Sequence, residues 1–299
     1  MGFEALLGND RLKENLTAGI SKGRISHFYL ISGPQGSGKK TLARLLAAAI
    51  LCKSPQKPCF TCPACRKVMA DTHPDLITVR DPEHKNVAVK IVRQIREDVF
   101  IRPNEADRKV YLFPQDLGIE GQNALLKVLE EPATSVFVLL CENREAMLQT
   151  VRSRCKTFRL APLSERDMLA ALQTRSDAPI QELQQAAAHS GGLLGRALDM
   201  LSGREKAGQA AARAFCHALS GDELTVWLAC QDLTKLTRED YADFCDESCR
   251  LLIQTVRRTG DRRCLDIFEY LEKQRSMLRQ NPSLTALAGA LAAFCGKTV

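Results

Sequence analysis

Residues 33–41 read GPQGSGKKT, a glycine-rich stretch with the residue types and spacing of a phosphate-binding loop. Gly33, Gly36 and Gly38 let the backbone curl so that successive N–H groups face an anion. Lys39 would reach the β- and γ-phosphates of a nucleotide, and the helix that we expect to open at Lys40 would add its positive end. The pattern G-x-x-x-x-G-K-[ST] requires a hydroxyl directly after this lysine. Lys40 stands there instead, so the usual Mg²⁺ ligand is missing.

The segments beside this loop support the interpretation. The apolar run 28–32 precedes it and the helical run 41–52 follows it, which is the strand–loop–helix order that such a loop requires. Thr41 comes one position late and points about a third of a turn away on the helix, so it cannot simply replace the missing hydroxyl. We expect a degenerate site at which binding of ATP or ADP stays open. A glycine-rich turn without a ligand is the alternative.

The strand that should supply the acidic residues of an NTPase is altered as well. Such enzymes usually place two carboxylates directly after an apolar strand, where they hold metal and orient water. Here the run 109–113 is followed by Pro114, Gln115 and Asp116. Proline offers no ligand, glutamine cannot act as a base, and the aspartate comes too late along the strand exit. Two independent defects predict that the chain has no ATPase activity of its own.

Four cysteines form the second candidate site. Cys52, Cys59, Cys62 and Cys65 are spaced C-x₆-C-x₂-C-x₂-C, so close pairs can chelate a metal and a more distant thiolate can complete a tetrahedron. Four thiolates leave no open position and predict structural Zn²⁺. An iron–sulfur cluster and buried free thiols are the alternatives. Three prolines within 55–63 prevent continuation of the preceding helix, so we expect a compact zinc knob at 52–65.

Composition bounds the remaining possibilities. With 45% hydrophobic and 26% charged residues over 299 positions, the chain has an ordinary globular composition and room for two or three domains. No apolar run approaches the roughly 18 residues of a membrane span, and the first residues resemble neither a secretory signal nor a transit peptide. We therefore expect a cytoplasmic protein with no membrane partner. A net charge of +7 permits contact with nucleic acid without requiring it.

The order of apolar patterns predicts an α/β domain followed by helices. Strand-like runs alternate with helices in the first half, which favours a parallel sheet covered on both faces. These runs are 28–32, 75–80, 109–113, 135–141 and 156–160. From Ser164 onward only helical periodicity remains. We predict an α/β domain at 1–162, a small helical lid domain at 163–202 and an all-α domain at 203–299.

Three further stretches carry a family resemblance. They are QNALLKVLEEP (Gln122–Pro132), TVRSRC (Thr150–Cys155) and SGGLLGRAL (Ser190–Leu198). With the loop and the cysteines, they resemble subunits of the bacterial DNA polymerase III clamp loader, an AAA+ assembly with a RecA-like core. The resemblance covers the whole chain: residues 8–34 resemble the N-terminal segment of the family, and residues 281–294 its last collar helix.

The resemblance implies roles for particular residues. In that family the S-R-C motif supplies an arginine finger to ATP on the neighbouring subunit, which implies this role for Arg154. Arg196 matches the second sensor arginine near the nucleotide, although a solvated arginine at a helix turn is the alternative. Leu7, Gly8 and Asn9 match the segment near the adenine.

Within the family, an intact S-R-C motif beside a failed hydrolysis apparatus resembles the delta-prime subunit. The resemblance then implies a non-motor subunit that joins gamma/tau and delta in a heteropentamer. That ring places the sliding clamp on primed DNA, so the chain would belong to the bacterial replisome. One alternative is an active gamma/tau-like ATPase that uses Asp116 and Thr41 in displaced roles. Another is a zinc-bearing nucleic-acid protein unrelated to replication.

A basic stripe is the weakest candidate for contact with DNA. Lys90, Arg93 and Arg96 recur every three residues on an expected helix before Pro103. Such a stripe can contact phosphates, but it is more often a solvated face.

Overall fold

The computed structural model describes residues 2–84, 86–130, 133–203, 207–278 and 282–297. It divides into two compact units, residues 1–201 and 202–299. Glu131 and Pro132, which end the QNALLKVLEEP stretch, and Asn281, which begins the expected last helix, lie outside the described residues. None of the helices in these described ranges combines the length and apolar character that a bilayer crossing requires.

The first unit is built on a five-stranded parallel sheet with strand order β2-β3-β4-β1-β5. This order puts β1 between β4 and β5, so the loop after β1 emerges near the middle of the sheet. All five strands fall within the predicted runs, and the predicted α/β core is confirmed. The strands are β1 (Phe28–Ser32), β2 (Leu76–Thr78), β3 (Val110–Phe113), β4 (Val136–Cys141) and β5 (Lys156–Arg159).

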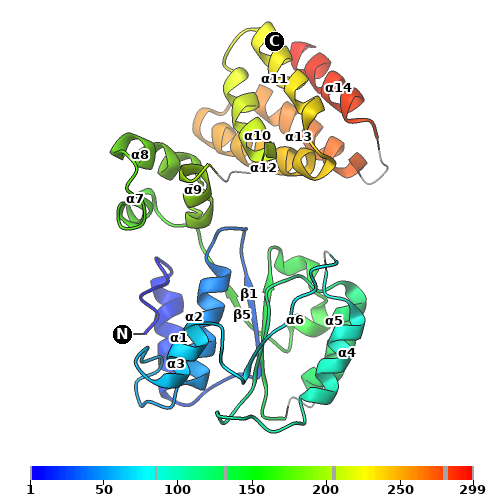
Figure 1. The fold of residues 1–299 in the computed structure, drawn as a ribbon. Helices are drawn as coiled ribbons and strands as arrows, with labels where there is room; N and C mark the ends of the chain where they lie inside the picture. Colours follow the sequence, from blue (N-terminus) through cyan, green and yellow to red (C-terminus); the bar gives the residue numbers. More distant parts are fainter. Residues whose placement is uncertain (1, 85, 131–132, 204–206, 279–281, 298–299) are drawn as a thin grey trace. The chain divides into compact units, whose positions relative to one another are not determined.

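Successive side chains of each strand point to opposite faces of the sheet, so each face has its own hydrophobic core. Tyr29 and Ile31 of β1 pack with α1, α2 and α3, whereas Phe28 and Leu30 pack with α4, α5 and α6 (Figure 1). Phe137 on β4 stacks on Phe28 at a centroid distance of 4.8 Å and extends the second core. The helices of these two layers are α1 (Asp10–Ser21), α2 (Lys39–Leu51), α3 (Pro63–Met69), α4 (Val89–Asp98), α5 (Ile119–Glu130) and α6 (Gln149–Arg152). A short 3₁₀ turn, Arg144–Ala146, precedes α6.

Three helices complete this unit: α7 (Glu165–Gln173), α8 (Ile180–His189) and α9 (Leu194–Leu201). We call them the lid helices. Ser164 caps α7 by accepting a hydrogen bond from the Asp167 N–H at 3.1 Å. Gly192, at φ 77°, lets the chain between α8 and α9 approach Leu163, whose N–H donates to the Gly192 carbonyl at 2.8 Å.

The second unit is helical throughout its described residues. Helix α12 packs between α10 and α13, and a Cβ at Gly208 would lie 1.9 Å from the Asp240 carbonyl oxygen, so glycine permits the close α10–α12 crossing. Burial raises the pKa of Cys245 and Cys249 to about 12, which suits inert core thiols. The helices are α10 (Ala207–Ala218), α11 (Glu223–Asp232), α12 (Arg238–Thr259), α13 (Arg262–Met277) and α14 (Leu284–Lys297). The three-domain division at 162 and 202 stays a prediction.

Candidate functional site

The glycine-rich loop has the backbone shape that its sequence predicts. It leaves β1 after Ser32 and enters α2 at Lys39, one residue before the predicted start of the helix. Gly36 and Gly38 have φ values of 81° and 92°, which L side chains rarely adopt. The loop therefore needs glycine at both positions.

The lysine of the loop is folded back on the loop itself. The Lys39 ammonium donates to the carbonyl oxygen of Gly33 at 2.5 Å and to that of Pro34 at 2.9 Å. Burial lowers the pKa of Lys39, and the nearby carboxylate of Glu142 opposes this shift. To reach a phosphate, the ammonium would have to leave both carbonyls. Lys40 and Thr41 are both exposed on the first turn of α2.

The cavity beside the loop is small. Its volume is about 60 Å³, and its walls include Leu6 and Leu7 of the N-terminal segment, Thr41 of α2 and Leu194 of α9. Pockets that hold small organic ligands usually measure roughly 300 Å³ or more. In this conformation the volume of the hollow beside the loop is well below that range.

The residue that replaces a catalytic carboxylate serves as a brace. The Gln115 side chain accepts from the Asp81 N–H at 2.9 Å and donates to the Asp81 carbonyl oxygen at 3.1 Å. It also donates to the His84 carbonyl oxygen. The Asp81 carboxylate in turn accepts from the His84 ring and, at 3.0 Å, from the Ala88 N–H. Gln115 thus ties the end of β3 to the loop after β2.

Sequence reasoning did not identify this role of Asp81, because no local pattern links it to Gln115. Asp116 is exposed beyond the brace, and its charge raises the pKa of Lys39 against the effect of burial.

The two arginines of the S-R-C stretch differ in their surroundings. Arg152 ends α6, is 22% exposed and pairs with Glu145 of the same unit. Arg154 is 45% exposed, its side chain donates to the Thr150 carbonyl oxygen at 3.0 Å, and a carboxylate oxygen of Glu130 lies 3.9 Å from its guanidinium. An exposed ion pair of that length contributes little. Arg154 is therefore the more available cation of the two.

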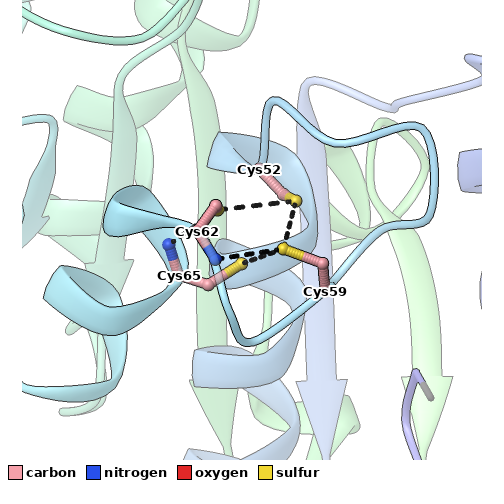
Figure 2. A group of neighbouring side chains, drawn as sticks. All are labelled: Cys52, Cys59, Cys62 and Cys65. Atoms are coloured by element: carbon pink, nitrogen blue, oxygen red, sulfur yellow. Dashed lines mark hydrogen bonds between the residues drawn. The ribbon is translucent and has the colours of Figure 1, made fainter.

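The four predicted cysteines form one compact cluster. Their sulfur atoms all lie within 4.8 Å of one another, on the stretch from the end of α2 to the first turn of α3 (Figure 2). The Sγ–Sγ distances are 3.6 Å for Cys52–Cys59, 3.9 Å for Cys52–Cys62 and 4.0 Å for Cys59–Cys65. A tetrahedral ion with Zn–S bonds of about 2.3 Å would separate its ligands by about 3.8 Å. The donor set and its spacing fit such an ion.

Local hydrogen bonds orient these sulfurs. The N–H groups of Cys62 and Cys65 donate to the sulfurs of Cys59 and Cys62, each at 3.4 Å. Hydrogen bonds from the Thr61 side chain and nearby backbone N–H groups lower the pKa of Cys59 to about 5. Burial raises the pKa of Cys65 to about 12, so a buried thiolate there requires a cation.

A family model described as "DNA polymerase III, delta subunit" matches residues 8–164, just over half of the chain. The chain belongs to the clamp-loader subunits of DNA polymerase III. A relative of this clamp-loader subunit, the DNA polymerase III subunit gamma of Buchnera aphidicola subsp. Acyrthosiphon pisum, is 32% identical over 209 residues, 67% of this chain and 57% of the relative.

The DNA polymerase III subunit delta' of Bacillus subtilis is 32% identical over 157 residues, 51% of this chain and 47% of that protein. The chain spans about half the length of these two relatives and 26% of the DNA polymerase III subunit tau of Escherichia coli. A solved gamma subunit-related protein from Thermotoga maritima has a TM-score of 0.51 at 19% identity and covers 96% of this chain, while 99% of its own length is matched. This likeness shows a shared fold. Relatives of both types are found, so the comparisons do not separate delta-prime from gamma/tau.

Two further expectations for this clamp-loader subunit concern arginines. Arg196 lies on α9 beside the phosphate-binding loop, and its side chain is 8% exposed rather than solvated; its role as the second sensor stays a prediction. On the other face of the sheet, Arg93 and Arg96 line a hollow of about 290 Å³ between α4 and α5, together with Lys127. Lys90 is not among the residues that line it.

Proposed function

We propose that this clamp-loader subunit is of the delta-prime type: it does not hydrolyse ATP and supplies Arg154 to ATP bound by a neighbouring subunit. One observation carries the proposal. Gln115, at the position of a catalytic carboxylate, is used as a structural brace, whereas Arg154 is half exposed and its ion pair with Glu130 is long and weak. A chain that hydrolysed ATP would need a carboxylate at the position of Gln115, available to metal and water and not used as a brace.

The chemistry of the finger follows from the guanidinium. It is planar and always charged, so it can neutralise the charge that spreads over the phosphoryl oxygens in the transition state. Ser153 supports the turn, because its hydroxyl donates to the Thr150 carbonyl oxygen at 3.1 Å. Cys155 packs against the core on the α4–α5 face of the sheet. These neighbours hold the backbone while the Arg154 side chain projects from it.

The four-cysteine cluster would hold structural Zn²⁺. Cys52, Cys59, Cys62 and Cys65 would saturate the ion and leave no position for water, so the metal would stabilise the knob and take no part in chemistry. The sulfur–sulfur distances of 3.6 to 4.0 Å support this assignment.

The partners follow from the family. We infer a heteropentamer with gamma/tau and delta that acts on the sliding clamp and on primed DNA. The second, helical unit would form the oligomerising collar. The cations at the α4–α5 hollow, Arg93, Arg96 and Lys127, are the candidates for contact with phosphate in the assembled ring.

The alternative, an active gamma/tau-like ATPase, has one observation in its favour. Asp116 is exposed, and its charge acts on Lys39, so it lies within electrostatic reach of the phosphate-binding loop. If Asp116 served as a displaced catalytic carboxylate, Asp116→Asn would abolish a measurable ATPase activity.

The experiment that separates these functions is ATP hydrolysis by the isolated chain, followed by reconstitution of the ring. Our proposal predicts negligible hydrolysis alone and an ATPase of the assembled ring that depends on this chain. Hydrolysis by the isolated chain that Asp116→Asn removes would support the alternative. If the chain does not assemble with gamma/tau and delta, both clamp-loader functions fail.

A further inference from the structure

The four cysteines of the knob differ in their access to solvent. Cys52 and Cys65 are 2% and 0% exposed, whereas Cys59 and Cys62 are partly exposed. A cysteine that ligates zinc does so as the thiolate, and the thiolate is also the form that oxidants attack. A small oxidant from solvent therefore meets Cys59 and Cys62 before it meets the two buried cysteines.

A buried sulfur lies beside both of these cysteines. The Cys52 sulfur is 3.6 Å from the Cys59 sulfur and 3.9 Å from the Cys62 sulfur (Figure 2). A disulfide bond measures about 2.05 Å, so the sulfurs of Cys52 and Cys59 need to approach by only about 1.5 Å. A thiol this close to an oxidised cysteine can react with it before a second oxidant does.

The helices at the two ends of the knob favour the Cys52–Cys59 pair. Cys52 follows the last residue of α2 with an extended backbone, and Cys59 lies in the segment before α3, so the two sulfurs can approach without moving a residue inside a helix. The Cys62 sulfur caps α3 by accepting from the Cys65 N–H at 3.4 Å. Cys65 lies within α3, and its thiol donates to the Ala48 carbonyl oxygen at 3.7 Å. A disulfide through either of these two would disturb α3.

We propose that Cys59 is an oxidation site and Cys52 its resolving cysteine, so that a hydroperoxide joins the two as a disulfide and releases the metal from the knob. The release of metal rests on the zinc assignment made above, but not on the role of Arg154. Because a structural zinc contributes folding free energy, its release loosens the knob, whose residues Cys65 and Val68 pack in one core with α2.

The chemistry balances with one hydroperoxide, here hydrogen peroxide. The Cys59 thiolate attacks the peroxide, an S–O bond forms, the O–O bond breaks, and the departing hydroxide takes up a proton to give water. The Cys52 thiolate then attacks the sulfur of the Cys59 sulfenic acid, the S–S bond forms, and the second hydroxide leaves and is protonated. Two thiolates, one peroxide and two protons thus give one disulfide and two waters. Zinc is left with two of its four thiolates.

The test treats the reduced full chain with an equimolar amount of hydrogen peroxide. Zinc released to a chromogenic chelator is measured, and disulfides are mapped by mass spectrometry of proteolytic peptides. Dimedone, which traps sulfenic acids, is added in a parallel sample. Cys249→Ser is the matched control, because it removes a buried thiol outside the cluster. Cys52→His keeps a four-ligand zinc site but removes the thiol that would react with Cys59.

We expect wild type and Cys249→Ser to lose most of their zinc and to form the Cys52–Cys59 disulfide. Both should take up zinc again after dithiothreitol and Zn²⁺ are added. In Cys52→His the sulfenic acid has lost its nearest partner, so several times more dimedone should be found on Cys59 than in wild type.

A disulfide between Cys59 and Cys62, or zinc that stays bound with all four thiols reduced, would overturn the proposal. If Cys52→His does not fold or hold zinc, the disulfide map of wild type decides. If the reduced wild type carries no zinc, the zinc assignment fails, and the map still decides on the oxidation site: a Cys52–Cys59 disulfide supports it, and any other pairing or none overturns it.

Discussion

The phosphate-binding loop and the Arg154 turn lie at opposite ends of the strands of the same parallel sheet and differ in how their charged side chains are used. The loop follows Ser32 at the carboxyl end of β1, whereas Arg154 precedes Lys156, which pairs with Tyr29 near the amino end of β1. At the loop, Lys39 donates to main-chain carbonyls and Gly36 accepts from the lid. At the turn, Arg154 is half exposed.

This difference suggests how a subunit can lose one function of an interface and keep the other. In the ring that we propose, this subunit would meet one neighbour with its phosphate-binding loop and the other with Arg154. Because the two features lie at opposite strand ends of the sheet, changes that bond Lys39 to the main chain of the loop need not disturb the Arg154 turn. If the phosphate-binding loop and the Arg154 turn are independent, a change at one should leave the other unaffected.

Loss of the metal should have the largest effect on stability, and this effect should be centred on α2 and the phosphate-binding loop. The cysteine knob packs against α2, the helix that leaves the phosphate-binding loop, and Cys65 is buried. We expect one zinc per chain, and Cys65→Ser should lower the zinc content to near zero and the stability by several kcal/mol. Elemental analysis and thermal unfolding measure these effects.

The matched control is Cys249→Ser, a buried thiol outside the cluster, which should retain the metal. Iron in place of zinc, or full stability of Cys65→Ser, would contradict the assignment.

Removal of the brace should have an intermediate effect on stability and none on the finger. Gln115→Ala leaves the main-chain groups of Asp81 without their side-chain partner, so we expect a loss of about 1 to 3 kcal/mol in unfolding free energy. Denaturant unfolding measures it. In the assembled ring this variant should turn over ATP at the wild-type rate. A selective loss of turnover without a loss of stability would mean that Gln115 is catalytic after all.

The smallest effect concerns pH. Hydrogen bonding to Asp81 raises the pKa of His84 above 6.5, and the same bond lowers the pKa of Asp81 below 3.8. The contribution of His84 is therefore full below about pH 6.5 and is lost as the pH rises through its raised pKa. The contribution of Asp81 is full above about pH 3.8 and is lost as the pH falls through its lowered pKa.

We expect the melting temperature of wild type to fall slightly between pH 6 and pH 8, and His84→Gln to show a flatter profile. Parallel profiles for the two proteins would remove the Asp81–His84 pair from the account of this loop.

The features that could be predicted from the sequence depend on residues close together in the chain. The glycines of the loop, the cysteine spacing and the strand runs each carry a local pattern, and the α/β core followed by helices is confirmed. The brace between Gln115 and Asp81 and the hydrogen bond from the Gly195 N–H to the Gly36 carbonyl oxygen join distant segments. Tertiary packing decides them, so no local pattern predicts them. The start of α2 at Lys39 differs by one residue, because Gly38 itself occupies the cap.

The central claim is that this chain gives catalysis to a neighbour and performs none itself. The most direct measurement compares Arg154→Ala with Lys39→Ala in reconstituted rings in which only the neighbouring ATP site can hydrolyse. A finger in trans has contributed ~10³ to 10⁵ in rate in other NTPases, so we expect Arg154→Ala to slow clamp- and DNA-stimulated turnover by at least ~10²-fold. Arg154→Lys should restore little of it, because it keeps the charge but loses the planar fork.

Lys39→Ala and the control Arg152→Ala should both turn over ATP as wild type does. If Arg154→Ala turns over ATP at the wild-type rate while Lys39→Ala does not, the phosphate-binding loop is functional, the Arg154 turn is not, and the account is wrong.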